Sequence, residues 1–567
     1  MPTIDIQLDD FEALLEQPVD ESALAVLLAG VKGNIKIYDR KNNAAKIELN
    51  DSNRPDLWSA EGIARQIRCR NHPPRYTCFS RTASHTIEVS KDLLTVRPYL
   101  AACIARGVKI TQTVLIQLIQ TQEKLAEGFG QQRQTASIGF YRLHAMTFPI
   151  RYLLADPDTT RFVPLGYDQS MSLSEILHHH PKGIAYAHTL KSIDRYPILV
   201  DAEHQILSFP PIINSRAVGE VAPGDDALLV EVTGTDLERV MLILNILACN
   251  LADRHAEIEP VDTRYSYETP WGATVTAPRN FSKQMSVDLS LFRILGEEIS
   301  AQEAALWLTR YGYEVQCDET ALILTAPPYR DDLMHPVDVV EDFAISRGYN
   351  TFTPEMPKTF TCGGIDVLER LQDSLREALI GFGFQEILSN MLASRQEMIN
   401  RMNIEHTPLP ERDILEITNP MTDRFSVLRS WILPFLLRVE SASAKTFYPH
   451  CIFEIGEVAA GATPYSGEIT IHLAVLMAHP TANFSELQSV LEGVLRRFGY
   501  TRHLEAISHP SFIEGRVGAI TLPPNPKPLG VIGEIHPEVL TRWQIGMPAV
   551  AFEIEVSPLL ARPAKSA

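Results

Sequence analysis

The 567-residue sequence lacks paired cysteines, long hydrophobic runs and a basic N-terminal leader. Its seven cysteines are scattered without a CxxC pair, which excludes a disulfide framework and a standard structural zinc site. The most apolar run, residues 240–252, is interrupted by Asn245 and Asn250 and is too short to span a bilayer, so it predicts a buried helix. No secretory signal or membrane segment is found, and the protein is predicted to be cytoplasmic.

Positive charge is also scarce, because 51 Lys and Arg face 70 Asp and Glu, which gives a net charge of −19. Phosphate contacts need clustered basic side chains, so binding to nucleic acid would require a local basic surface or a partner that supplies one. The composition, with 45% hydrophobic and 21% charged residues, is that of a globular protein. At this length a single core is insufficient, and about three to five domains are expected.

Carboxylates are concentrated in residues 326–350, APPYRDDLMHPVDVVEDFAISRGYN. Pro336 suits a first helical turn and Gly348 a C-terminal stop, so a helix is expected over residues 337–347. Three carboxylates at positions i, i+3 and i+4 share one face of this helix. Two more precede it on a loop, so the full set is Asp331, Asp332, Asp338, Glu341 and Asp342.

This acidic cluster has two interpretations. Magnesium prefers a few carboxylates plus water, so several oxygen-bearing side chains at this spacing suit that ion. Acidic residues near the first turn of a helix also complement the helix dipole, and on spacing alone this plainer interpretation ranks first.

The string PPYRDDLMHPVDVVEDFAISRGYN resembles the segment that precedes the synthetase-like core in beta subunits of phenylalanyl-tRNA synthetases. NRPDLWSAEGIAR, at residues 53–65, is similar to the family element "NRPDLLS.EGLAR". Residues 419–434 contain the NP, VLR and LP elements of the family pattern "NP…vLRtsLLPgLL". Because the extra modules of the longer bacterial type are not found, the chain resembles the shorter archaeal and eukaryotic form.

The resemblance implies an α+β multidomain fold. Residues 1–100 would form an N-terminal α/β module and residues 101–265 an editing-type α/β domain that contacts tRNA. Residues 266–355 would form a winged-helix-like module with the acidic cluster, and residues 356–567 a non-catalytic, class II synthetase-like core with an antiparallel sheet. Magnesium, shared with the alpha subunit, would be held by Asp332, Asp338, Glu341 and Asp342.

The same resemblance implies a phenylalanine–tRNA ligase that works as an α₂β₂ heterotetramer. The alpha subunit would use ATP to activate phenylalanine and attach it to tRNA(Phe), while this chain supplies the partner surface. The core agrees with that division, because no paired arginines suited to the triphosphate of ATP are found. Arg424 and Arg429 are interpreted as surface residues that pair with neighbouring acids.

Residues 196–236 predict a hairpin that ends at Pro210 and Pro211, followed by another strand. In the family this region lines a pocket that hydrolyses tyrosine misattached to tRNA(Phe). An apolar pocket rejects an added hydroxyl only weakly, so a second site that hydrogen-bonds the hydroxyl is a physical solution. The matching polar residues, which would form the catalytic site for editing, are Asn214, Ser215, Glu231 and Thr233.

Within that set, Glu231 would bind the phenol, while Thr233 and Ser215 would position the ester or the water. A structural alternative is that Asn214 and Ser215 satisfy a turn and Thr233 is an ordinary strand residue.

A second hypothesis is a non-enzymatic scaffold that keeps the fold and the partner surface but neither edits nor belongs to an active ligase. The acidic balance favours it, as does the sequence Gly130-Gln131-Gln132-Arg133, where the family pattern suggests a basic, glycine-rich stretch.

Overall fold

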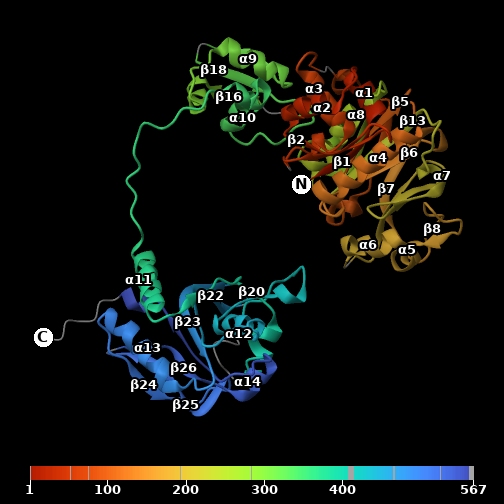
Figure 1. The fold of residues 1–567 in the computed structure, drawn as a ribbon. Helices are drawn as coiled ribbons and strands as arrows, with labels where there is room; N and C mark the ends of the chain where they lie inside the picture. The colour runs from red at the N-terminus through yellow and green to blue at the C-terminus, as the bar shows by residue number, and fades with distance from the viewer. Residues whose placement is uncertain are drawn as a thin grey trace. The chain divides into compact units, whose positions relative to one another are not determined.

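The computed structural model describes residues 2–560 except 52, 74–75, 192, 282–283, 319, 406–413, 464–465 and 524. The chain divides into two compact units, Met1–Met356 and Pro357–Ala567 (Figure 1). Both units combine helices with sheets, which confirms the mixed α/β, multidomain expectation; the finer domain boundaries stay predictions. Within the described ranges, no helix is both long and apolar enough to cross a membrane.

The first unit begins with a three-stranded antiparallel sheet of order β1-β3-β2. Its strands are β1 (Thr3–Gln7), β2 (Gly33–Asp39) and β3 (Ala44–Leu49), and its helices are α1 (Leu8–Leu15), α2 (Glu21–Leu28) and α3 (Ala60–Cys69). The Ser59 side chain accepts the N–H of Gly62 and so starts α3. The Arg54 guanidinium before it is buried and donates to Asp56 and Gln66.

A ten-stranded mixed sheet occupies the centre of the first unit, in the order β12-β11-β10-β7-β4-β14-β5-β13-β6 with β15 beside β14. Strand β13 lies antiparallel between β5 and β6, whereas β4 runs parallel to β7 and β14. The strands are β4 (His85–Val89), β5 (Tyr99–Arg106), β6 (Ala136–Arg142), β7 (Ile150–Ala155), β10 (Tyr196–Val200), β11 (Ile206–Phe209), β12 (Ile213–Asn214), β13 (Ala227–Gly234), β14 (Glu257–Thr269) and β15 (Gly272–Ala277).

Around this sheet lie a two-stranded sheet and several helices, namely β8 (Arg161–Phe162), β9 (Met171–Ser172), α4 (Gln112–Lys124), α5 (Leu173–His179), α6 (Pro181–Tyr186) and α7 (Arg216–Gly219).

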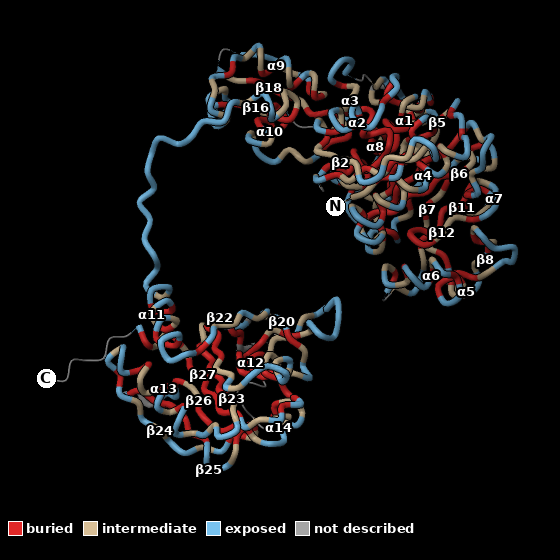
Figure 2. The backbone as a smooth tube through the Cα atoms, in the orientation of Figure 1, coloured by how far each residue is buried: buried red, intermediate tan, exposed pale blue. Residues whose placement is uncertain are grey.

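The apolar run forms helix α8 (Leu237–Asp253), which packs against β5 and β13. Asp236 accepts the N–H of Arg239 and starts the helix. The predicted buried helix is confirmed, and Figure 2 shows α8 among the buried parts of the first unit. Its buried Asn245 is satisfied because the side-chain amide donates to the carbonyls of Arg279 and Pro328, at 2.8 Å each.

A small module follows, with the three-stranded sheet β16 (Gln284–Asp288), β18 (Ala321–Thr325) and β17 (Glu314–Cys317), and the helices α9 (Ala301–Arg310) and α10 (Pro336–Arg347). Phe292, Leu308 and Phe343 belong to its own core. Pro336 occupies the first turn of α10 and Gly348 follows its last residue, which confirms the predicted helix.

The second unit contains a seven-stranded sheet, in which β19 pairs parallel with β22 and the remaining pairs are antiparallel. The strands are, in sheet order, β19 (Gln385–Glu386), β22 (His450–Thr463), β23 (Ser466–Ala478), β27 (Ala549–Glu555), β26 (Asn525–Ile535), β25 (Phe512–Leu522) and β24 (His503–Ala506). A short pair, β20 (Leu392–Ala393) and β21 (Val427–Leu428), stands apart.

Helices cover both faces of this sheet because its strands carry apolar side chains on alternate sides. Along β23, Leu473 and Val475 share a core with α11 (Val367–Gly381) and α13 (Phe484–Arg497). Ala474 and Leu476 belong to the core with α12 (Leu433–Ala442) and α14 (Pro537–Arg542). Figure 2 shows these central strands buried.

The surface assignment of Arg429 is wrong. Its guanidinium is buried and donates to Glu454 at 2.7 Å and to the backbone carbonyl of Glu457 at 2.7 Å. The strand that carries Glu454 brings this carboxylate to the arginine, a pairing that local sequence does not reveal.

Candidate active site

A cavity of about 270 Å³ lies between helix α4 and strands β6, β11, β12 and β13. Of the four residues predicted for the editing site, Asn214 and Glu231 line it. The side-chain amide of Asn214 donates to the carbonyl of Phe140, which lines the same cavity, at 3.3 Å. Two of the predicted polar groups are therefore brought to one cavity.

Glu231 is held at this cavity by its neighbours on β6. It lies opposite Gly139 in the sheet register, and a side chain at Gly139 would come within 2.4 Å of Glu231 Oε2 and 2.3 Å of the Tyr141 hydroxyl. The absence of that side chain lets the Tyr141 hydroxyl donate to Glu231 Oε2 at 2.8 Å. The same hydroxyl lies 2.9 Å from Ser208 Oγ, so three buried polar groups meet at this point.

The environment of Glu231 is unusual for a carboxylate. The residue is 2% exposed, and its Oε1 atom accepts no hydrogen bond from the described residues. Burial raises the pKa of Glu231 to about 7, although the Tyr141 hydrogen bond and the positive charge of Arg97 oppose the rise. Near neutral pH this side chain is therefore available as a hydrogen-bond acceptor or, when protonated, as a donor.

Thr233 and Ser215 are not among the residues that line the cavity, and the roles predicted for them stay predictions. Thr233 Oγ1 lies 2.9 Å from Ser137 Oγ and accepts from Arg97 Nε at 3.1 Å, so it supports a buried network behind the cavity wall. Ser215 is buried, its backbone N–H donates to the Leu207 carbonyl at 2.8 Å, and its Oγ has no hydrogen-bond partner in the described structure.

In the acidic segment, each of the four carboxylates predicted to bind magnesium already has a partner within the protein. Arg330 binds both oxygens of Asp332, at 2.9 and 2.7 Å, and also Oδ2 of Asp342, at 2.7 Å. Asp338 accepts the backbone N–H groups of Met334 and His335, and Glu341 pairs with Lys32 at 2.5 Å.

In the described part of the chain, no three such side chains gather at one point where a metal ion would bind. The described residues of this chain alone do not bring Asp332, Asp338, Glu341 and Asp342 together at one point, and the magnesium site shared with an alpha subunit stays a prediction. Arg330 supplies the positive charge for two of these carboxylates, and the capping of α10 uses a third. These four residues do not fit a magnesium ion without ligands from elsewhere.

Comparisons with known proteins now identify the family. A family model described as the phenylalanyl tRNA synthetase beta chain CLM domain matches residues 353–556, and a tRNA synthetase B5 domain model matches residues 290–349. The phenylalanine–tRNA ligase beta subunit of Thermococcus kodakarensis is 38% identical over 99% of this chain and 100% of its own length. The chain belongs to the family of phenylalanine–tRNA ligase beta subunits.

Other members of this beta-subunit family agree over the same length. The subunit of Borrelia recurrentis is 36% identical, again over 99% of this chain and 100% of its own length. Among solved structures, an N-terminal fragment of the phenylalanyl-tRNA synthetase beta subunit from Pyrococcus horikoshii has a TM-score of 0.58 and 35% identity. The match covers 61% of this chain and 100% of the fragment. As a member of this family, the chain is part of an aminoacyl-tRNA ligase.

Several residues of this beta-subunit chain at the cavity were not predicted from the sequence. Arg133 lines the cavity and donates to the carbonyls of Pro211 and Ile212, at 3.2 and 3.0 Å, which fixes the loop before β12. It ends a run of three non-glycine residues with positive φ, from Gln131 to Arg133. Such residues rarely adopt this conformation, so no local pattern indicates it.

Magnesium is expected to leave the thermal stability of this beta-subunit chain unchanged when the chain is studied alone. The reason is that Arg330, Lys32 and the α10 backbone already pair its carboxylates. Thermal unfolding with EDTA and with about 5 mM Mg²⁺ checks this expectation. A higher transition temperature with Mg²⁺ that Asp338→Asn abolishes would restore the predicted ion site.

The raised pKa of Glu231 predicts a pH-dependent stability. The folded chain keeps a proton on Glu231 up to about pH 7, whereas the unfolded chain loses it near the ordinary value of 4.5. Stability from this group therefore falls as pH rises through that window. Glu231→Gln cannot lose a proton, so it avoids this loss of stability at high pH. The variant should be more stable than wild type by roughly 3 kcal/mol at pH 8 and by much less at pH 5.

Thermal unfolding of both proteins at the two pH values measures this difference. Glu220→Gln, at an exposed residue of the same cavity, serves as the control, and it should show no comparable pH dependence. A gap between Glu231→Gln and wild type that stays the same at pH 5 and pH 8 would contradict the assigned pKa.

Proposed function

We propose that this chain is the beta subunit of a cytoplasmic phenylalanine–tRNA ligase that works with an alpha subunit as an α₂β₂ heterotetramer. The complex converts ATP, L-phenylalanine and tRNA(Phe) to AMP, diphosphate and L-phenylalanyl-tRNA(Phe). Similarity over 99% of the chain to proteins named as such beta subunits supports this proposal.

The synthetic reaction is assigned to the alpha subunit. In the second unit, Arg429, which was expected at the surface, forms a buried ion pair with Glu454 and donates to the Glu457 carbonyl. The Arg429 guanidinium therefore links the end of β21 to β22 and is not available to bind a triphosphate. This observation supports a structural role for the synthetase-like unit of this chain.

We further propose that the cavity around Glu231 hydrolyses tyrosyl-tRNA(Phe). The observation that carries this proposal is the buried Glu231 carboxylate, whose Oε1 atom has no partner in the described structure. The hydroxyl of a tyrosyl group can satisfy that atom, whereas a phenylalanyl group leaves it unpaired, and an unpaired buried polar group costs free energy. The site therefore favours the misattached amino acid over the correct one.

The other polar groups at the cavity are assigned by position. Asn214 and Ser137 line it and supply an amide and a hydroxyl near Glu231, while Tyr141 orients Glu231 from β6. Thr233 and Arg97 hold Ser137 from behind, at 2.9 and 3.0 Å. In this arrangement Asn214 and Ser137, and not Ser215 and Thr233, position the ester or the attacking water.

Co-expression with a candidate alpha chain tests the ligase proposal. A stable complex of α₂β₂ mass that exchanges pyrophosphate with ATP when phenylalanine is added supports it, with no exchange by the beta chain alone. A stable complex that shows neither exchange nor deacylation of tyrosyl-tRNA(Phe) would favour the non-enzymatic scaffold.

A further inference from the structure

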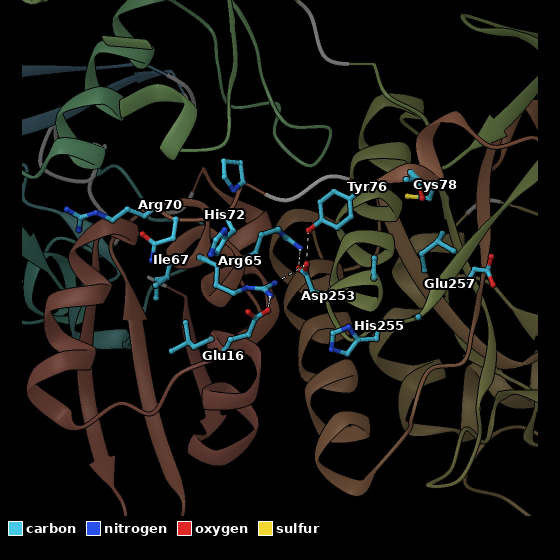
Figure 3. Close-up of a pocket in the computed structure, with 18 of the residues that line it drawn as sticks. Glu16, Arg65, Ile67, Arg70, His72, Tyr76, Cys78, Asp253, His255 and Glu257 are labelled. Atoms are coloured by element: carbon cyan, nitrogen blue, oxygen red, sulfur yellow. Dashed lines mark hydrogen bonds and ion pairs between the residues drawn. The ribbon is translucent and has the colours of Figure 1, made fainter. Parts of the chain in front are cut away.

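A second cavity, of about 760 Å³, lies in the first unit (Figure 3). It is formed by the C-terminal ends of α1 and α8, by helix α3 with the segment after it, and by the start of β14. Among the described residues, it shares no lining residue with the Glu231 cavity. The ligase and editing proposals do not use it.

Basic side chains dominate the walls of this cavity. Four arginines line it, and two of them, Arg65 and Arg68, are three residues apart on α3 and so share one face of that helix. The other two are Arg70 and Arg81, and three carboxylates also line the cavity, namely Glu16, Asp253 and Glu257. In a chain of net charge −19, this is a local concentration of guanidinium groups.

The carboxylates do not neutralise the interior of the cavity. Asp253 is the buried one, and it is shared by Arg65 at 2.8 Å, Arg68 at 3.2 Å and the Tyr76 hydroxyl at 2.8 Å. Figure 3 shows Arg65, Tyr76 and Asp253 meeting in the centre of the site. Two guanidinium groups thus share one buried carboxylate, and the second counter-charge for Arg68 is the exposed carboxylate of Glu16, at 2.7 Å.

Donors on the same two arginines remain unused. Arg65 is 1% exposed, and its Nε and Nη2 atoms have no hydrogen-bond partner in the described structure; the same holds for Arg68 Nε. The Arg65 guanidinium lies over the Tyr329 ring, 4.3 Å from its centroid, which fixes its plane. Buried donors without acceptors are rare, and a group with several acceptor oxygens would remove this cost.

The rim adds two guanidinium groups that are only weakly engaged. Arg81 pairs with Glu257 at 2.7 Å, but both side chains are largely in water, where such a pair contributes little. Arg70 is exposed and lies 5.9 Å from the centroid of the Trp307 ring. The Arg70 and Arg81 side chains can therefore move to contact an anion in the cavity at a small cost in free energy.

We propose that this cavity binds a phosphate ester, either a phosphodiester of RNA or the phosphates of a free nucleotide. Guanidinium groups match the oxygens of a phosphate in geometry and charge, and several of them converge from separate elements. The cavity provides a local basic surface in a chain whose net charge is negative. It stands whether or not the Glu231 cavity edits.

Inorganic diphosphate binding to the full-length chain, measured by isothermal titration, tests the proposal. The double variant, Arg70→Gln with Arg81→Gln, changes two exposed side chains. The single variant Arg68→Gln changes a partly buried side chain. Each is expected to weaken binding by about tenfold or more, because hydrogen bonds to charged groups contribute on the order of this factor. Arg496→Gln, at an exposed arginine paired with Glu492 in the second unit, is the matched control and should not change binding.

A labelled tRNA(Phe) transcript identifies the source of the phosphate. If RNA is bound, the double variant weakens tRNA binding and lowers the slope of log affinity against log salt by about one for each lost contact. If a free nucleotide is bound, the variants weaken diphosphate and ATP binding but leave tRNA binding unchanged.

Arg68→Lys keeps the charge and should retain more diphosphate binding than Arg68→Gln, which separates a loss of charge from a loss of folding. The proposal is overturned if neither diphosphate nor tRNA distinguishes wild type from the double variant. It is also overturned if Arg496→Gln weakens binding as much as the cavity variants do.

Discussion

Glu231→Ala should slow the deacylation of tyrosyl-tRNA(Phe) by at least about 100-fold in the complex with the alpha subunit. The expected effect is large because the variant removes the acceptor for the tyrosyl hydroxyl, and a site built to bond a hydroxyl discriminates by such factors. It also leaves the Tyr141 hydroxyl without its 2.8 Å partner. Single-turnover deacylation, with the transition temperature recorded in parallel, provides the measurement.

Ser215→Ala, at the N-cap of α7, gives the matching comparison. Ser215 does not line the cavity and its Oγ has no partner in the described structure, so deacylation should change by less than about threefold, well under 1 kcal/mol. Deacylation by Glu231→Ala as fast as by wild type would remove the site assignment. A comparable loss with Ser215→Ala would restore the role predicted for Ser215 from the sequence.

Arg330→Met should destabilise the first unit by about 3 to 5 kcal/mol, because it leaves Asp332 and Asp342 buried without their counter-charge. The Asp342 pKa is already raised by burial, and Arg330 is the strongest influence that opposes this rise. Loss of the guanidinium removes that influence. The destabilisation should therefore shrink when the pH falls far enough to protonate both carboxyl groups.

Thermal and urea unfolding at pH 7 and pH 4 measure this effect. Arg293→Met is the control in the same small module, because Arg293 and its partner Glu298 are both highly exposed, and its effect should stay within about 0.5 kcal/mol. Equal stability of Arg330→Met and wild type at pH 7 would show that the two carboxylates do not depend on this arginine.

The sequence was most informative where a local pattern decides the structure. Helix α8 was predicted from an apolar run that only Asn245 and Asn250 interrupt, and α10 from a proline at its first turn and a glycine after its last residue. Glu231 was selected through family resemblance, and the structure places it at a cavity. In these cases a short stretch of chain contains the deciding residues.

Long-range pairing explains what the sequence did not reveal. The family resemblance placed Asp332 and Asp342 around one ion, but which cation they face depends on the fold, which turns the adjacent Arg330 toward both. The family resemblance assigned Glu231 and Thr233 of β13 to one site. Arg97, which comes from a different part of the chain, instead draws Thr233 into a buried network.

The amide of Asn245 joins two points that lie on either side of the β16-β18-β17 sheet in the sequence. Arg279 precedes β16 and Pro328 follows β18, and both carbonyls accept from this one side chain on α8. The segments that lead into and out of this small sheet are therefore tied to the same turn of one helix. Any rotation of the sheet as a rigid body about these two segments would first have to break these hydrogen bonds.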